Sequence, residues 1–397
     1  MTFLIGNSIA IALAALAGQQ PEKLQSPVTQ LPADSASALP QQVQFLRASI
    51  GPRQEPVIPT PGTAQGDSSA LGKPGPQNPN SFNPQISLVS DFRALLSSKV
   101  RQDDKKFDFR EIEIGFAADV DPFLRGEVYI AFAKEDGESI TEVEEAFGRY
   151  SNLGRGLSAK FGKIAAAIGR VQRNHADQLN YLDYPLMVQD FLGEEGLRAG
   201  GASLSYLLPG DRFHEFTIEG LDAEDAPLFA GAHSGVPVWV GHYRTFFDFT
   251  EDSSAQFGAT YANGPGGAGK GDRSNLFGVD LVYKWIPGAK GKSLVLEGEA
   301  MWGKSGQAGS RNAFGAFAAV TYQLRPNWFG YFKFDTSQAP DSTNNRNAWA
   351  LGLTLRPTEF HHWRVEFQQI RSNFETTRNV LNVQFQFAIG AHPAHKY

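Results

Sequence analysis

The feature that most constrains this chain is a two-residue alternation of apolar and polar side chains, which recurs throughout the sequence after Pro84. The segment LNVQFQFAI, from Leu381 to Ile389, shows it clearly. Successive side chains of a β-strand point to opposite faces, so this period predicts strands with one apolar face and one polar face. About sixteen such segments occur, beginning near residues 85, 107, 123, 140, 157, 197, 213, 236, 254, 275, 293, 312, 328, 347, 361 and 379.

The length and chemistry of these segments favour a barrel over a soluble sandwich. About ten residues is the length that a tilted strand needs to cross a bilayer. The apolar faces end in Trp, Tyr or Phe, whereas the polar faces carry small or charged residues. Lipid outside, a wet lumen inside and aromatic girdles at both interfaces are typical of outer-membrane barrels. We therefore predict an all-β fold over residues 82–397, a transmembrane antiparallel β-barrel of about 16 strands.

The connections between the segments support this prediction independently. With the N-terminus in the periplasm, the odd connections should be long outer loops and the even ones short turns. The even ones are mostly short and carry Pro, Gly, Asn or Asp, as in Asp119–Pro122 and Leu324–Asn327. The odd ones are generally longer, at 97–106, 133–139, 170–196, 222–235, 263–274, 303–311, 336–346 and 371–378.

Two segments precede the barrel. The apolar run from Phe3 to Ala17 has the length of a signal-peptide core, and Ala15-Leu16-Ala17 fits a small-x-small cleavage site, so residues 1–17 are expected to be a signal peptide. A buried strand or helix is the alternative for this run. Residues 18–81 are rich in Pro, Gln and Ser without either regular period, which predicts a disordered linker.

Composition and motifs exclude several classes of protein. Without Cys, the chain has no disulfide scaffold, Cys-ligated zinc or iron–sulfur cluster. A net charge of −6 argues against a nucleic-acid partner. No nucleophile–base constellation, phosphate-binding loop or HExxH motif occurs, so we expect no enzyme activity and no cofactor.

The third outer loop, 170–196, is the longest connection and the least strand-like. A loop of this length inside a compact fold needs a reason. We expect it to fold inward and to narrow the channel with its charged side; a surface lid or an oligomer contact is the alternative. Its polar residues are Arg170, Arg173, His175, Asp177, Tyr181, Asp183, Asp190, Glu194 and Glu195.

Charged residues on the polar faces are expected to line the pore. A barrel of about sixteen strands leaves an aqueous passage, and charges on its wall act on passing solutes. Their mixed signs, with a mild acidic excess, predict a weak preference for cations; ordinary wetting of the lumen is the alternative for any single residue. The expected pore-lining charges are Glu111, Glu113, Arg125, Glu127, Arg244, Asp280, Lys284, Glu297, Glu299, Lys333, Asp335, Arg364 and Glu366.

The eight His residues raise the question of a metal site. Adjacent strand residues point to opposite faces, which argues against a site shared by His361 and His362. His392 and His395, near the chain end, have a spacing that chelates a metal and are weak candidates. We expect no metal site.

Four stretches resemble a family of plug-less bacterial outer-membrane barrels often labelled zinc-regulated TonB-dependent outer membrane receptors. They are FNPQISLVSD (82–91), REIEIGFAADVDP (110–122), YPLMVQDFLGEEG (184–196) and GAHPAHKY (390–397). The layout is also similar to that of phosphate-selective porins. The resemblance covers about residues 82–397, and the family label implies a TonB-linked receptor.

Together these features predict a porin-like channel for passive diffusion of small hydrophilic solutes or ions, constricted by loop 170–196. The expected location is the outer membrane of a Gram-negative-type bacterium, and the expected partners are its lipid, the solutes and the barrel-insertion machinery, which recognises a terminal aromatic such as Tyr397. Porins commonly form trimers, so a homotrimer is a possible assembly, although the sequence shows no interface signature. The alternative is a metal-responsive (zinc) receptor or uptake barrel that lacks a plug domain.

Overall fold

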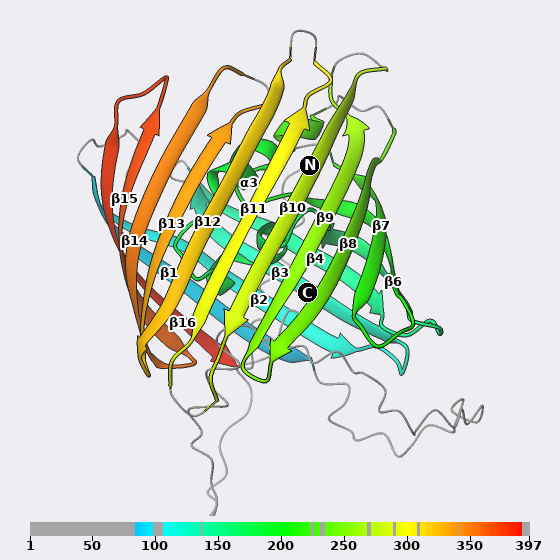
Figure 1. Ribbon diagram of the computed structural model, residues 1–397, viewed down its shortest axis with the longest axis horizontal. Coiled ribbons are helices and arrows are strands. Elements are labelled where there is room, and N and C mark those ends of the chain that lie inside the picture. Colours follow the sequence, from blue (N-terminus) through cyan, green and yellow to red (C-terminus); the bar gives the residue numbers. More distant parts are fainter. Residues whose placement is uncertain are drawn as a thin grey trace, which may run out of the picture. The chain divides into compact units, whose positions relative to one another are not determined.

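The computed structural model describes residues 84–97, 106–135, 138–223, 226–230, 235–267, 271–288, 291–307, 310–340 and 342–390. In this part of the chain sixteen antiparallel strands form a closed barrel (Figure 1). Among the same residues, no helix is both long enough and apolar enough to cross a membrane. The predicted signal peptide (1–17), the linker (18–81), His392 and His395 lie outside the described residues.

The sixteen strands begin within two residues of their predicted starts. In chain order they are β1 (Gln85–Ser97), β2 (Phe107–Asp119), β3 (Leu124–Glu135), β4 (Glu138–Tyr150), β5 (Leu157–Ala165), β6 (Arg198–Leu207), β7 (His214–Asp222), β8 (Val238–Thr250), β9 (Ser253–Pro265), β10 (Arg273–Trp285), β11 (Leu294–Lys304), β12 (Asn312–Arg325), β13 (Trp328–Gln338), β14 (Asn345–Thr358), β15 (His361–Ser372) and β16 (Arg378–Gly390).

Each strand pairs with its neighbours in the sequence, and β1 closes the barrel by pairing with β16. The closing register runs from Ser87 opposite Gly390 to Ser97 opposite Val380. Closure leaves the sheet without an edge, so the backbone groups of the first and last strands are satisfied by each other.

The predicted alternation separates an apolar outer face from a polar inner face. On β15, Trp363, Val365 and Phe367 are between 37% and 46% exposed. Arg364 and Glu366, which alternate with them, are each 1% exposed. Aromatic residues lie near both ends of the outer face: Phe277, Trp302 and Phe314 have ring centroids 5.7 and 5.4 Å apart in turn, and Trp363 and Phe385 lie 4.4 Å apart near the other end.

Five register shifts occur between paired strands of the described residues, and none was predicted; the two away from the short turns are β-bulges on β2 and β4. On β2, Asp91 is opposite Glu111 and Phe92 is opposite Phe109, so Arg110 is an additional residue. On β4 the corresponding shift makes Glu144 the additional residue. A bulge changes which face the following residues occupy. It therefore allows adjacent residues of one strand to share the inner face.

The outer connections differ by a few residues from their predicted bounds, as the second and third show. β3 and β4 keep pairing as far as Glu135 opposite Glu138, so the second outer connection is much shorter than 133–139. The third runs over 166–197 rather than 170–196, because β5 ends at Ala165 and β6 begins at Arg198. There the Ala166 N–H donates to the Leu197 carbonyl oxygen at 2.9 Å, which brings the two ends of the loop together.

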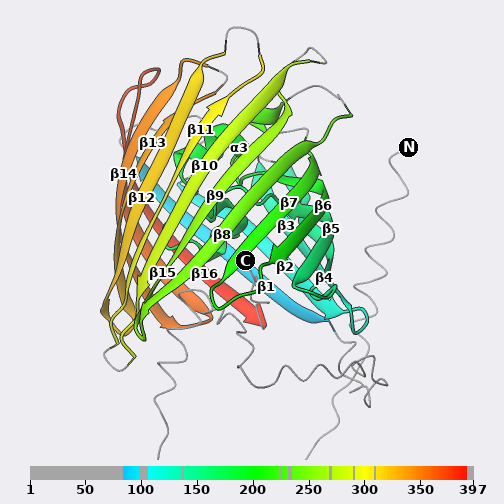
Figure 2. The same cartoon turned by 45° about the vertical axis from the view of Figure 1, so that its right-hand side comes forward.

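Most of the buried apolar side chains lie inside the barrel. The two connections that contribute to them contain short helices, η2 (Val171–Arg173), η3 (Ala176–Gln178) and α3 (Leu186–Leu192) after β5, and η4 (Pro227–Phe229) after β7. All of these except η3 hold buried apolar residues, and the other buried apolar residues lie on the strands or in the loops. Met187, Phe191 and Phe229 belong to one buried cluster with wall residues such as Ala313. Figure 2 shows α3 enclosed by the wall.

Candidate functional site

The connection 166–197, which we call the lumen loop, is the candidate functional site. Its polar groups bond to wall strands on several sides of the barrel, and its apolar groups pack against β12 and β13. The loop thus crosses the interior instead of covering the rim.

The first part of the loop is anchored by backbone N–H groups that donate to wall carboxylates. Ala167 donates to Glu219 Oε2 at 2.7 Å, and Arg170 and Val171 donate to Glu299 Oε1 at 2.8 and 2.5 Å. Between them Gly169 has φ +64°, and a Cβ there would lie 2.4 Å from Glu299 Oε2. Only glycine fits both the left-handed conformation and this close approach.

Arg170 and Gln172 hold the same segment from two directions. The guanidinium of Arg170 donates to Glu297 Oε2 at 2.9 Å. Gln172 is fully buried; its Nε2 donates to the Ala166 carbonyl oxygen, and its Oε1 accepts from Leu197 N–H at 3.1 Å. A single amide side chain therefore joins the start of the loop to its end.

His175 lies on the opposite side of the lumen, among glutamates of β2 and β4. Its Nδ1 is 2.6 Å from Glu113 Oε2 and 2.7 Å from Glu144 Oε2, and its Nε2 is 3.2 Å from Glu145 Oε1. Burial on its own lowers the pKa of His175, but Glu113 and Glu144 raise it well above its ordinary value. The imidazolium form therefore links the loop to this wall when no other cation is present.

The loop segment after His175 contacts β15, β16 and β1. Arg364, which is 1% exposed, donates from Nη1 to the Tyr181 carbonyl oxygen and from Nη2 to the Leu179 carbonyl oxygen, both at 2.9 Å. Gln386 donates to the Asp177 carbonyl oxygen at 3.3 Å. Loop carbonyl groups are thus satisfied by wall side chains, as buried backbone groups require.

Asp183 of the loop forms an ion pair with Arg93 of β1. Its Oδ1 accepts from Arg93 Nη1 at 2.6 Å, and its backbone carbonyl oxygen accepts from Lys333 Nζ at 3.0 Å. Burial on its own raises the pKa of Asp183, but the guanidiniums of Arg93 and Arg110 lower it to about 2. Asp183 is therefore ionised at neutral pH.

Helix α3 packs against glycine residues of the wall. A Cβ at Gly315 would lie 2.5 Å from the Cβ of Met187, and one at Gly303 would lie 2.7 Å from a ring carbon of Phe191. Asp190 at the end of the helix pairs with Arg346 of β14. Small wall residues thus provide the room that the helix occupies.

The structure brings some of the predicted residues into contact with the loop. Glu113, Glu297, Glu299, Lys333, Arg364 and Glu366 bond to it directly. Others pair within the wall: Arg125 with Asp119 and Glu127, Arg244 with Glu215, and Asp335 with Lys333. Asp280 is opposite Glu299 on the neighbouring strand, Lys284 is half-buried on β10, and Glu111 lies near Glu144.

Of the remaining predicted loop residues, Arg173 ends η2, Glu194 is exposed in a turn and Glu195 lies 3.7 Å from Arg110. Tyr181 is fully buried, with its ring 4.7 Å from Lys333 Nζ. The sequence reasoning missed Arg93, Arg110, Glu144, Glu145 and Glu219. For Arg110 and Glu144 the reason is the bulge, whose position is set by the pairing with the neighbouring strand.

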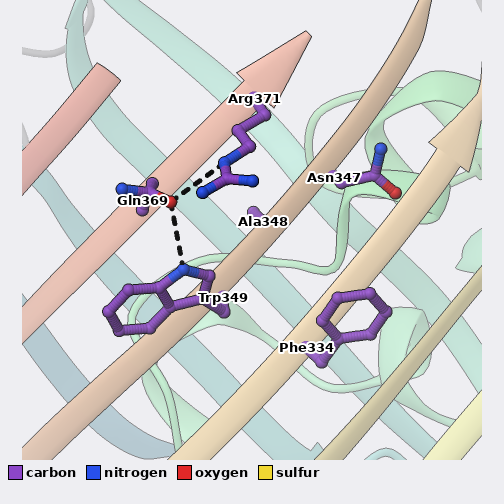
Figure 3. A pocket seen from close by; sticks show the side chains of 6 residues that line it. All are labelled: Phe334, Asn347, Ala348, Trp349, Gln369 and Arg371. Carbon is purple, nitrogen blue, oxygen red and sulfur yellow. Dashed lines mark hydrogen bonds between the residues drawn. The ribbon is translucent and has the colours of Figure 1, made fainter. Parts of the chain in front are cut away.

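A pocket of about 240 Å³ lies on the outer face rather than in the lumen (Figure 3). Its lining includes Phe334, Trp349 and Arg371, with Trp349 Nε1 donating to Gln369 Oε1 at 3.3 Å and Arg371 Nε donating to the same oxygen at 3.0 Å. Two residues after Trp349 on the same face of β14, Leu351 is paired with Phe332 of β13 and Phe367 of β15. The pocket therefore marks where the apolar outer band becomes polar.

Comparison with known proteins identifies the fold. No family model matches the chain. An uncharacterized protein of Aquifex aeolicus (strain VF5) is 24% identical over 389 residues, which cover 81% of each chain. Many solved structures are similar, and three of them illustrate the likeness. OprB of Pseudomonas putida has a TM-score of 0.56 and 10% identity, covering 78% of this chain and 94% of that chain. The outer membrane channel DcaP of Acinetobacter baumannii has a TM-score of 0.54 and 12% identity, covering 77% of this chain and 96% of that chain.

The third structure, an anion-selective porin from Comamonas acidovorans, has a TM-score of 0.54 and 9% identity, covering 77% of this chain and 99% of that chain. This likeness confirms the predicted fold, a closed antiparallel barrel of sixteen strands like those of outer-membrane porins. None of the three is described as a TonB-linked receptor, so the comparisons do not support that label.

Proposed function

We propose that this chain forms a porin-like channel for passive diffusion of small hydrophilic solutes or ions. The observation that carries the proposal is a closed barrel of sixteen strands whose inner face holds buried and half-buried charges while its outer face is apolar. Barrels of this strand number are wide enough for an aqueous passage. The similar structures described as a porin and as a channel support the same conclusion.

The outer membrane of a Gram-negative-type bacterium is the proposed location. Large apolar residues such as Leu351 and Ile218, 58% and 61% exposed, recur around the outer face. Contiguous apolar surface of this extent is stable only against hydrocarbon or a partner. Export through residues 1–17, insertion by the barrel-insertion machinery and assembly as a homotrimer belong to this proposal.

The lumen loop is the proposed constriction. Its bonds to Glu299 on one side, His175–Glu113 on another and Arg364 on a third leave solutes only the space beside it. Charges on both the loop and the wall would then act on every passing ion. The mild acidic excess of the predicted lining residues supports a weak cation preference.

A metal-responsive receptor or uptake barrel is the second candidate, favoured by the buried His175 among Glu113, Glu144 and Glu145. A channel gives ohmic conductance in simple salts. An uptake barrel of this kind instead shows saturable, metal-dependent transport and little conductance.

The test is single-channel recording in a planar bilayer on the refolded full chain and on a variant that lacks residues 176–192. We expect steady steps in KCl that increase in size after the deletion, and a reversal potential of cation sign in a KCl gradient. A control deletion of 267–271 in the connection between β9 and β10 should leave the step size unchanged. A folded, heat-modifiable barrel that conducts neither before nor after the deletion would contradict the proposal.

A further inference from the structure

Loop and wall side chains converge at one buried place whose donor set is unlike the ion pairs elsewhere in the lumen. His175 of the lumen loop, Glu113 of β2 and Glu144 of β4 each offer one donor atom, and these three atoms all lie within 4.8 Å of one another. The side chains are 1%, 6% and 5% exposed. We propose that these three residues bind a divalent transition-metal cation.

A second donor set is continuous with the first. Carboxylate oxygens of Glu111, Glu144 and Glu195 also lie within 4.8 Å of one another, so Glu144 belongs to both sets. The bulge on β4 places Glu144 beside Glu145 on the inner face, and both are buried. Loop and wall therefore contribute ligands from three separate segments of the chain.

The charge of the cluster favours a bound cation. Glu111, Glu113, Glu144, Glu145 and Glu195 supply five carboxylates, and the guanidiniums near them are Arg110, 3.7 Å from Glu195, and Arg198, 4.0 Å from Glu144. Asp177 and Lys160 add one charge of each sign at the margin. Like charges this close in a buried place are stable only with bound protons or a bound cation.

Glu113 provides an observation separate from the acidic cluster. Its Oε2 contacts His175, but its Oε1 is buried and has no hydrogen-bond partner among the described residues. A buried carboxylate oxygen without a donor is costly and rare in native proteins. A cation bound between Glu113 and His175 would supply the missing partner.

The donor types select the class of ion. Imidazole with carboxylates suits zinc and the neighbouring first-row divalent cations better than magnesium or calcium, which prefer oxygen alone. Ligand atoms about 2.1 Å from a tetrahedral ion lie roughly 3.4 Å apart. His175 Nδ1 and Glu113 Oε2 are now 2.6 Å apart, so the side chains must separate slightly as the ion replaces the imidazolium proton. The site does not depend on whether the barrel conducts.

Isothermal titration of the refolded full chain with Zn²⁺, after removal of metal with a chelator, tests the proposal. We expect one ion per chain, proton release on binding, and affinity at least tenfold weaker in His175→Gln and Glu144→Gln. His214→Gln is the matched control, because His214 is a half-buried wall residue bonded to Tyr243 Oη at 2.7 Å, outside the cluster. Its affinity should equal that of the unchanged chain.

Co²⁺ absorption provides a second readout that reports the ligands directly. The bound ion should give tetrahedral d–d bands that are lost in Glu113→Gln, a variant that retains the imidazole. Heat-modifiability on a gel identifies any variant that has not folded, and Glu144→Gln then replaces Glu113→Gln. Absence of stoichiometric binding to the folded chain would overturn the proposal. Binding that survives His175→Gln but is lost when His392 and His395 are changed would also overturn it.

Discussion

Gly315 of β12 lies directly against Met187 of α3, so that a Cβ at position 315 would be 2.5 Å from the Cβ of Met187. The wall has no room for even one methyl group beneath the helix. Gly315→Ala should therefore displace the helix, with a loss of about 1–3 kcal/mol in the stability of loop docking. Protease cleavage within 166–197 should become faster. Gly278→Ala is the control, because its nearest neighbour is 3.7 Å away and cleavage should not change.

Arg364 is the wall residue that satisfies two loop carbonyl oxygens at once. Arg364→Gln leaves at least one of them buried without a donor, which should cost about 2–4 kcal/mol of docking free energy. We expect noisier and larger single-channel currents as the loop detaches. Arg125→Gln removes a guanidinium that pairs with Asp119, away from the loop, and should leave the current noise unchanged. Equal noise in the two variants would contradict the role of Arg364.

Asp183 predicts how loop docking depends on acid. Its pKa is lowered to about 2 by Arg93 and Arg110 despite burial, so its contribution is complete above its unfolded pKa of about 4 and is lost as the pH falls through 2. Its side chain is 33% exposed, so solvent screening reduces the effect to about 1–2 kcal/mol.

Hydrogen exchange of loop amides, corrected for intrinsic rates, should rise between pH 4 and pH 2. Asp183→Asn should weaken this pH dependence, whereas Asp211→Asn, in an exposed turn, should leave it unchanged. A loop whose protection is constant down to pH 2 would refute the prediction.

Leu351 lies midway along β14 on the outer face, in a row with Phe332 and Phe367. If this row faces hydrocarbon, Leu351→Arg should lower the free energy of unfolding by about 2–4 kcal/mol in lipid vesicles. Asn347→Arg, four residues nearer the strand end beside Arg371, should lower it by at most about 1 kcal/mol. Equal effects at the two positions would place the membrane boundary elsewhere.

Most of the wall could be predicted from the sequence because one physical rule governs it. A strand between lipid and a wet lumen must alternate, and Trp363, Val365 and Phe367 of β15 follow this rule without exception. The rule fails at a β-bulge, where one strand has an additional residue that has no counterpart on its paired strand. The bulges at Arg110 and Glu144 depend on cross-strand pairing, which no single segment contains.

The loop contacts were less accessible to sequence reasoning. Length and composition predicted an inward fold and included His175 and Asp183 among its polar residues. Their partners Glu144 and Arg93 could not be identified, because they lie 31 and 90 positions away on strands whose relative height depends on barrel shear. Glycine at 315 likewise gave no sign that a helix would pack against it.

The lumen loop also spans the seam at which the barrel closes. Asp183 holds Arg93 of β1, while the carbonyl oxygen of Asp177 accepts from Gln386 of β16, 209 positions along the chain. Each contact joins the loop to one of the two closing strands, so that with both formed the loop opposes their separation. The loop therefore links β1 to β16 from inside the barrel, in addition to the backbone hydrogen bonds of the closing register.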